Sequence, residues 1–131
     1  ETALDILVAS LEHGWDQEYG GIRYLTNIDW TPCHSLEADL KLWWPHGEAL
    51  YALLFAWAHT GYQEFHQWYD KVHQYTFHHF PDRDYGEWFG YLNRDGRPVW
   101  TAKANGWKGF FHVPRILFRG YQLLQQTATQ P

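Results

Sequence analysis

The stretch that decides the fold is KLWWPHGEALYALLFAWAHTG, residues 41–61. From Glu48 to Thr60 it is apolar on nearly all sides of a helix, a pattern typical of a helix that is buried over most of its surface. Pro45 has no N–H to donate and is tolerated in the first turn of a helix, so we expect it to break or restart the helix here. His46 and Glu48 would then point from that first turn into a cleft walled by tryptophans.

Four other segments carry apolar residues at helical spacing. They predict helices over about 2–14, 63–80 and 110–126, and a shorter one that begins at Ser35 and reaches Trp44. The glycine-rich segment 20–32 is expected to form a loop or short hairpin, and the residues Asn-Arg-Asp-Gly at 93–96 predict a β-hairpin turn. The side chains expected to pack inward are Phe65, Trp68, Tyr69, Val72, Tyr75 and Phe80, and in the last helix Val113, Ile116, Leu117, Tyr121 and Leu124.

The chain also repeats itself. EYGGIRYL at 18–25 is echoed by DYGEWFGYL at 84–92, and their Tyr-Gly pairs lie 66 residues apart. His46 and His112 are separated by the same 66 residues, and each stands at the start of an apolar helix. This predicts a duplicated unit of helix, loop and helix, and such units stack into solenoids or close into rings. The two histidines should then lie at the same end of the helical array.

Composition narrows the class of protein. The net charge of −5 argues against a nucleic-acid partner, and no apolar stretch reaches the roughly 18 residues of a membrane span. A single cysteine, Cys33, excludes an internal disulfide and is typical of a reducing compartment, so we expect a cytoplasmic location. With Trp 9, Tyr 9 and Phe 8, the rings are too many for one small core. Some should line a cleft for a sugar-like ligand or a subunit interface.

A second candidate cluster is GWKGFFHVPR, with Trp107, Lys108, His112 and Arg115. A histidine at a helix N-terminus is favoured in its neutral form, which can act as a general base near neutral pH. Each residue also has an ordinary explanation, since tryptophans are often core residues and helix charges often face solvent. No HExxH, CxxC, GxGxxG or P-loop pattern occurs, so we expect neither a metal nor a bound nucleotide at a known motif.

Three motifs together carry a family resemblance. KLWWPHGEAL, YTFHHFPDRDYGEWFGYLNRDG and GWKGFFHVPR resemble the C-terminal part of the N-acylglucosamine 2-epimerase family, whose animal members are also called renin-binding proteins. The resemblance implies an all-α fold of helical hairpins with short β-hairpin loops, closed into an (α/α)6 barrel. Residues 1–131 would form about two of the six hairpins, the C-terminal portion of one epimerase domain.

The resemblance also implies a chemistry. The family interconverts N-acetylglucosamine and N-acetylmannosamine: the ring opens, a base removes the C2 proton alpha to the aldehyde, and a second group returns a proton to the opposite face. His112 matches one of the two histidines that serve these steps, whereas the upstream histidine and an essential N-terminal arginine have no counterpart here. Glu48 is expected to orient or polarise the substrate. The expected substrate-binding residues are His46, Trp44, Trp107, Arg115 and Lys108, the last two as candidates for stabilising the enolate.

Other interpretations stay open. The resemblance implies an N-acylated hexosamine or related monosaccharide as partner and no required cofactor, and a nucleotide effector is known in animal members, for which no site can be placed here. An aldose–ketose isomerase would begin with the same C2 deprotonation. The chain could instead be a stand-alone homo-oligomer in which three copies close a ring. It could also be a non-catalytic sugar-binding module that uses Trp44 and Trp107 as a platform.

Overall fold

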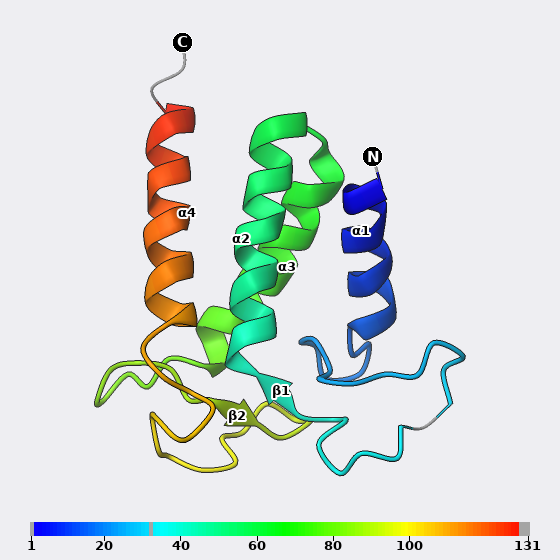
Figure 1. The fold of residues 1–131 in the computed structure, drawn as a ribbon, viewed down its shortest axis with the longest axis vertical. Helices are drawn as coiled ribbons and strands as arrows, with labels where there is room; N and C mark the ends of the chain where they lie inside the picture. Colours follow the sequence, from blue (N-terminus) through cyan, green and yellow to red (C-terminus); the bar gives the residue numbers. More distant parts are fainter. Residues whose placement is uncertain (1, 32, 129–131) are drawn as a thin grey trace.

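The computed structural model describes residues 2–31 and 33–128 and is mostly helical. All four helices stand side by side, and the two long connections lie together at one end (Figure 1). The N-termini of the second and fourth helices therefore lie at the same end, as the repeat predicts. The elements are α1 (Thr2–Gly14), β1 (Lys41–Leu42), α2 (Trp43–Thr60), α3 (Gln63–His79), β2 (Tyr91–Leu92) and α4 (His112–Ala128).

The stretch before Pro45 differs from the expectation. No helix runs from Ser35 to Trp44: turns lead into β1, whose Lys41 pairs antiparallel with Leu92. Helix α2 begins directly after this strand, and Pro45 is its third residue. The N–H groups in the first turn of a helix have no carbonyl partner within that helix, so a proline at this position costs no hydrogen bond. One helix therefore replaces the two that the proline suggested.

The core lies where α2 packs against α3 and α4. Leu53 of α2, Val72 of α3, and Phe80 and Leu92 from the second long connection are fully buried. Gly61 ends α2 in a left-handed conformation (φ 69°) and donates its N–H to the carbonyl of Trp57, as a C-terminal glycine typically does. Over the part of the chain that the structure describes, no helix is long and apolar enough to cross a membrane.

The repeated loops have the same structure. Asp16 begins the first and Asp82 the second, and each carboxylate accepts hydrogen bonds from the amides two and three residues further on, at 3.1 and 3.3 Å and at 3.0 and 3.1 Å. Five residues after each aspartate the backbone is left-handed, at Gly21 (φ 76°) and Glu87 (φ 61°). The predicted duplication is confirmed for these loops.

The helices that follow these loops are not related by the same offset. Pro45 is the third residue of α2 and Pro114 the third residue of α4, so they lie 69 residues apart, three more than the loops. His112, the first residue of α4, therefore occupies the place of Trp43, and His46 occupies the place of Arg115. The prediction that the two histidines are equivalent is wrong, because the stretch from the loop aspartate to the start of the following helix is three residues longer in the second half.

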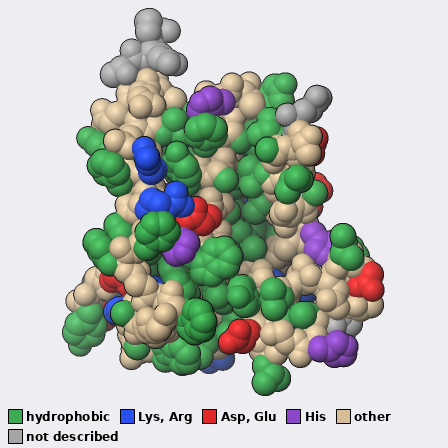
Figure 2. Space-filling model, in the orientation of Figure 1, with side chains coloured by type: hydrophobic (Ala, Val, Ile, Leu, Met, Phe, Trp, Pro, Cys, Tyr) green, Lys and Arg blue, Asp and Glu red, His purple; other side chains and the backbone are tan. Residues whose placement is uncertain are grey.

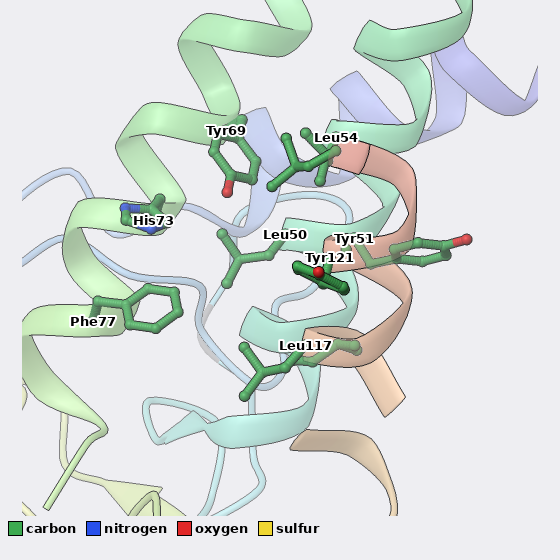
Figure 3. Close-up of a pocket in the computed structure, with 11 residues that line it drawn as sticks. Leu50, Tyr51, Leu54, Tyr69, His73, Phe77, Leu117 and Tyr121 are labelled. Carbon is green, nitrogen blue, oxygen red and sulfur yellow. The ribbon is translucent and has the colours of Figure 1, made fainter. Parts of the chain in front are cut away.

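One face of α4 is not covered. Val113 and Ile116 are buried as predicted, but Leu117, Tyr121 and Leu124 are 45%, 61% and 47% exposed, so the prediction that they pack inward is wrong. They line an open apolar hollow of about 240 Å³ between α2, α3 and α4 (Figure 3). Figure 3 labels Leu50, Tyr51 and Leu54 of α2, Tyr69, His73 and Phe77 of α3, and Leu117 and Tyr121 of α4 around it.

Candidate active site

Three charged or titratable side chains join the N-terminal turns of α2 and α4. The Nδ1 atom of His112 lies 2.8 Å from Oε1 of Glu48, and the guanidinium of Arg115 donates to the other carboxylate oxygen. In Figure 2 basic, acidic and histidine side chains gather beside α4. Glu48 of α2 thus bridges two residues of α4 that are one helical turn apart.

The electrostatics of this bridge determine the state of His112. Partial burial raises the pKa of Glu48, but the hydrogen bonds from Arg115 and His112 lower it by more. The pKa of Glu48 therefore lies below its ordinary value. Glu48 is therefore ionised at neutral pH. An ionised carboxylate only accepts hydrogen bonds, so Nδ1 of His112 must carry the proton it shares. The Nε2 atom of His112 is left to exchange a proton with another molecule.

His112 faces a hollow walled by aromatic rings. The hollow measures about 390 Å³, and the rings of Trp44 and His112 lie 5.9 Å apart along its wall. Trp107 forms part of the rim and is 88% exposed. Flat rings beside titratable groups suit an amphipathic ligand, since they offer an apolar face next to polar partners. The residues that line the hollow are Tyr24, Glu37, Leu42, Trp43, Trp44, Tyr91, Trp107 and His112.

The structure brings most of the predicted site residues together. Trp44, Trp107 and His112 line the hollow, while Glu48 and Arg115 support His112 from α2 and α4. Their contact with a substrate stays a prediction. Within residues 2–31 and 33–128, no group of His, Cys, Asp and Glu side chains is arranged to hold a metal ion.

Lys108 does not serve the hollow. Its side chain is 2% exposed, and its ammonium donates to the carboxylate of Glu87 and, at 2.8 Å, to the carbonyl of Lys103. Two partners on the second long connection therefore hold this charge. The expectation that Lys108 stabilises an enolate beside His112 is wrong for this arrangement.

His46 is a core residue. Its Nδ1 lies 2.7 Å from the carbonyl oxygen of Leu42, and because a carbonyl only accepts, Nδ1 must carry the proton. Its Nε2 accepts a hydrogen bond from the amide N–H of Ile22 at 2.9 Å. The ring stacks on Tyr75 and is fully buried. Both nitrogens are used by the backbone, so the expectation that His46 contacts substrate is wrong. It ties the first long loop to the first turn of α2.

The burial of His46 predicts a pH-dependent stability. Burial lowers its pKa to about 3, so below the ordinary value of 6.5 the unfolded chain binds a proton that the folded chain does not. Stability is therefore lost as the pH falls, by about 2 kcal/mol between pH 7 and pH 5. His46→Gln keeps a donor and an acceptor but cannot titrate, so it should lose less stability over this interval. Urea unfolding of both proteins at the two pH values measures the difference, and equal losses would contradict the prediction.

A buried ion pair beside the site has no counterpart among the sequence predictions. The side chains of Asp16 and Lys41 are fully buried, with Nζ 3.0 Å from Oδ2, and Arg94 adds hydrogen bonds of 2.8 and 3.2 Å to the same carboxylate. Burial raises the pKa of Asp16, but the hydrogen bonds from Arg94 and Lys41 lower it well below its usual range. Lys41 directly precedes Leu42 and Trp43, so this pair fixes the strand that leads into the hollow. The available signals were a lone lysine in an apolar run and an aspartate repeated at position 82.

Comparisons with known proteins agree on one family. The sequence model of the family described as N-acylglucosamine 2-epimerase (GlcNAc 2-epimerase) matches residues 1–115. The N-acylglucosamine 2-epimerase of Bos taurus is 47% identical over 111 residues, and that of Homo sapiens 38% over 125. These alignments cover 85% and 95% of this chain but 26% and 29% of the relatives. The chain therefore spans little more than a quarter of their length.

Solved structures show the same fold. Cellobiose 2-epimerase from Spirochaeta thermophila DSM 6192 superposes with a TM-score of 0.71 at 23% identity, over 92% of this chain and 28% of that one. A D-mannose isomerase gives a TM-score of 0.70 at 19% identity, over 88% and 28%. At these identities the likeness concerns the fold alone. It confirms the predicted fold class, helical hairpins of the (α/α)6-barrel type.

Proposed function

This chain belongs to the N-acylglucosamine 2-epimerase family, and on that premise we propose that the full-length protein is a sugar 2-epimerase that interconverts N-acylglucosamine and N-acylmannosamine. The observation that carries the proposal is the pairing of His112 with Glu48 at the wall of the aromatic hollow. A histidine whose Nε2 is left free beside a space of this kind can exchange a proton with a bound ligand.

The proposed reaction is a proton transfer at C2 of the ring-opened sugar. Nε2 of His112 takes or returns the proton alpha to the aldehyde, and the ionised Glu48 stabilises the imidazolium that forms. Arg115 keeps Glu48 ionised, because its guanidinium already occupies the second carboxylate oxygen. The family resemblance assigns proton transfer on the opposite face to a second histidine that has no counterpart in this sequence. The activity is therefore proposed for the full-length protein.

The aromatic wall fits the same substrate class. Trp44 and Trp107 would pack against the C–H faces of a sugar, while its hydroxyl and amide groups reach the polar groups of the hollow. The identity of 38–47% to N-acylglucosamine 2-epimerases favours epimerisation over aldose–ketose isomerisation, since the D-mannose isomerase is 19% identical.

The proposal is tested by incubating the full-length protein with N-acetylmannosamine in deuterated water. We expect deuterium at C2 together with the appearance of N-acetylglucosamine, both followed by proton NMR. A ketose product would instead indicate an aldose–ketose isomerase. A protein that binds the sugar without C2 exchange would be a binding module, and the epimerase proposal would be dropped.

Glu48→Gln should slow the reaction while preserving the shape of the site. The amide oxygen can still accept a hydrogen bond from one of the two donors, His112 or Arg115, but the charge that favours the imidazolium is gone. Since a hydrogen bond to a charged group is worth roughly 1.5–3 kcal/mol, we expect kcat to fall by about 10- to 100-fold. Steady-state kinetics on the full-length protein measure this, with Glu64→Gln at the other end of the helices as a control that should behave as wild type. A kcat equal to wild type would show that the carboxylate does not assist His112.

A further inference from the structure

We infer that Glu37 is a substrate-binding and specificity-determining residue: its carboxylate accepts hydrogen bonds from the hydroxyl or amide groups of a neutral sugar and disfavours sugars that carry a phosphate or carboxylate. The inference rests on the proposed function and adds to it. Glu37 belongs to the connection between α1 and β1 and lines the same hollow as Trp44 and His112. Neither the family motifs quoted above nor the repeat points to it.

The backbone at Glu37 is fixed relative to the aromatic wall. The carbonyl of Glu37 accepts the N–H of Leu40 at 3.0 Å, and the carbonyl of Leu40 accepts the N–H of Tyr24 at 2.9 Å. The ring of Tyr24 meets Trp44 edge-on, with centroids 6.4 Å apart, and Tyr24 also lines the hollow. Two backbone hydrogen bonds and one ring contact thus connect Glu37 to the wall that carries His112. Although the side chain is exposed, the backbone from which it extends is held in place.

The charge of Glu37 is not neutralised by the site. Among the described residues that line the hollow, Glu37 is the one Asp, Glu, Lys or Arg. Within the described chain its hydrogen bonds are made by its backbone, and its carboxylate takes part in no ion pair. Cations near the hollow are paired with other carboxylates: Lys41 with Asp16, Lys108 with Glu87 and Arg115 with Glu48.

An uncompensated carboxylate has two effects on a ligand. It can accept hydrogen bonds from O–H or N–H donors, and bonds to a charged acceptor are stronger than neutral ones. It also raises the energy of any anion brought into the same space. A neutral N-acylated amino sugar offers several hydroxyl donors and one amide donor, and it carries no anionic group that the carboxylate would repel. A hexosamine 6-phosphate carries such a group and would be repelled.

The test compares Glu37→Gln with wild type in the full-length protein, with Glu12→Gln on α1 as a control of the same charge change. For N-acetylmannosamine we expect KM to rise about tenfold while kcat stays within about twofold, since the lost interaction is made in the ground state as well as the transition state. N-Acetylmannosamine 6-phosphate should inhibit Glu37→Gln about tenfold more tightly than wild type, because one repulsive charge is removed. Glu12→Gln should match wild type in all three quantities.

Unchanged KM and unchanged inhibition in Glu37→Gln would overturn the inference, and so would a loss confined to kcat. Titration calorimetry with the sugar and its phosphate reads binding without turnover, so the inference is tested even if the wild-type protein shows no exchange at C2. An absence of C2 exchange in the wild-type protein would overturn the proposed epimerase activity but not the role of Glu37 in binding. Thermal unfolding of the variant checks that the exposed substitution leaves the fold intact.

Discussion

His112→Asn should lower the rate of C2 proton exchange by about 100- to 10,000-fold, the range that a positioned general base contributes. Asparagine can still donate a hydrogen bond to Glu48 through its amide, so the link between α2 and α4 should survive. What is removed is the Nε2 lone pair, the atom that the Glu48 hydrogen bond leaves free. The fold and sugar binding should therefore change far less than the exchange rate.

The measurement is proton NMR of C2 deuteration by the full-length protein. His59→Asn is the matched control, because this histidine lies at the far end of α2, where its Nδ1 is 2.8 Å from the carbonyl of Phe55 and its ring stacks on the ring of that residue. His59→Asn should exchange at the wild-type rate. If His112→Asn exchanged as fast as wild type, His112 would not be the acid or base and the assignment of the site would fail.

Asp16→Asn should be the most destabilising single change of a polar residue. It leaves the fully buried Lys41 ammonium without its counter-charge, and an amide nitrogen in place of Oδ2 removes the hydrogen bond from Nε of Arg94. Breaking a buried pair by removing one partner costs roughly 3–5 kcal/mol of unfolding free energy. Urea unfolding monitored by tryptophan fluorescence would measure this loss, and circular dichroism would show whether the variant folds at all.

The repeat provides a control for Asp16→Asn. Asp82 caps the second loop in the same way, and Asp82→Asn removes a carboxylate that pairs with the partly exposed Lys103. The loop hydrogen bonds are equivalent in the two variants, so the difference between them isolates the buried ion pair. We expect Asp82→Asn to be much the milder change. Equal losses would show that the loop caps, and not Lys41, account for the effect.

Helical periodicity was sufficient for most of the fold. The apolar spacing in 2–14 and 63–80 predicted α1 and α3 within one residue at each end. It failed at residues 35–44, where the backbone pairing of β1 with β2 competes with a helix. The hairpin turn predicted at 93–96 does follow β2, and Leu92 forms an antiparallel bridge with Pro98 across it. A strand of two residues is too short to show an alternating pattern, so the sequence carried no signal for β1 or for its pairing with β2. Leu117, Tyr121 and Leu124 were predicted to pack inward because they lie on the apolar face of α4. The sequence does not show whether another segment covers that face.

The site was predicted in part. The FHVPR and WWPHGE motifs identified His112 and Glu48, and the structure places them in contact. The repeat misassigned His46, because one offset was applied to both the loops and the helices. Asp16 and Lys41 are 25 residues apart, and although a lone lysine in an apolar run is a signal of burial, nothing in a single sequence pairs it with Asp16. Glu37 could not be distinguished from other loop carboxylates until its neighbours were known.

The three-residue difference between the two helix starts has a consequence for how duplicated halves diverge. Three residues advance a helix by about 4.5 Å and rotate it by about 300°. A short insertion in a connection therefore carries a side chain from the interior to an accessible wall without altering the helix itself. The two histidines, 66 residues apart, show both results: His46 is an internal staple and His112 faces open space. In the register of the helices, the position in the first half that corresponds to His112 is held by Trp43, a buried core residue.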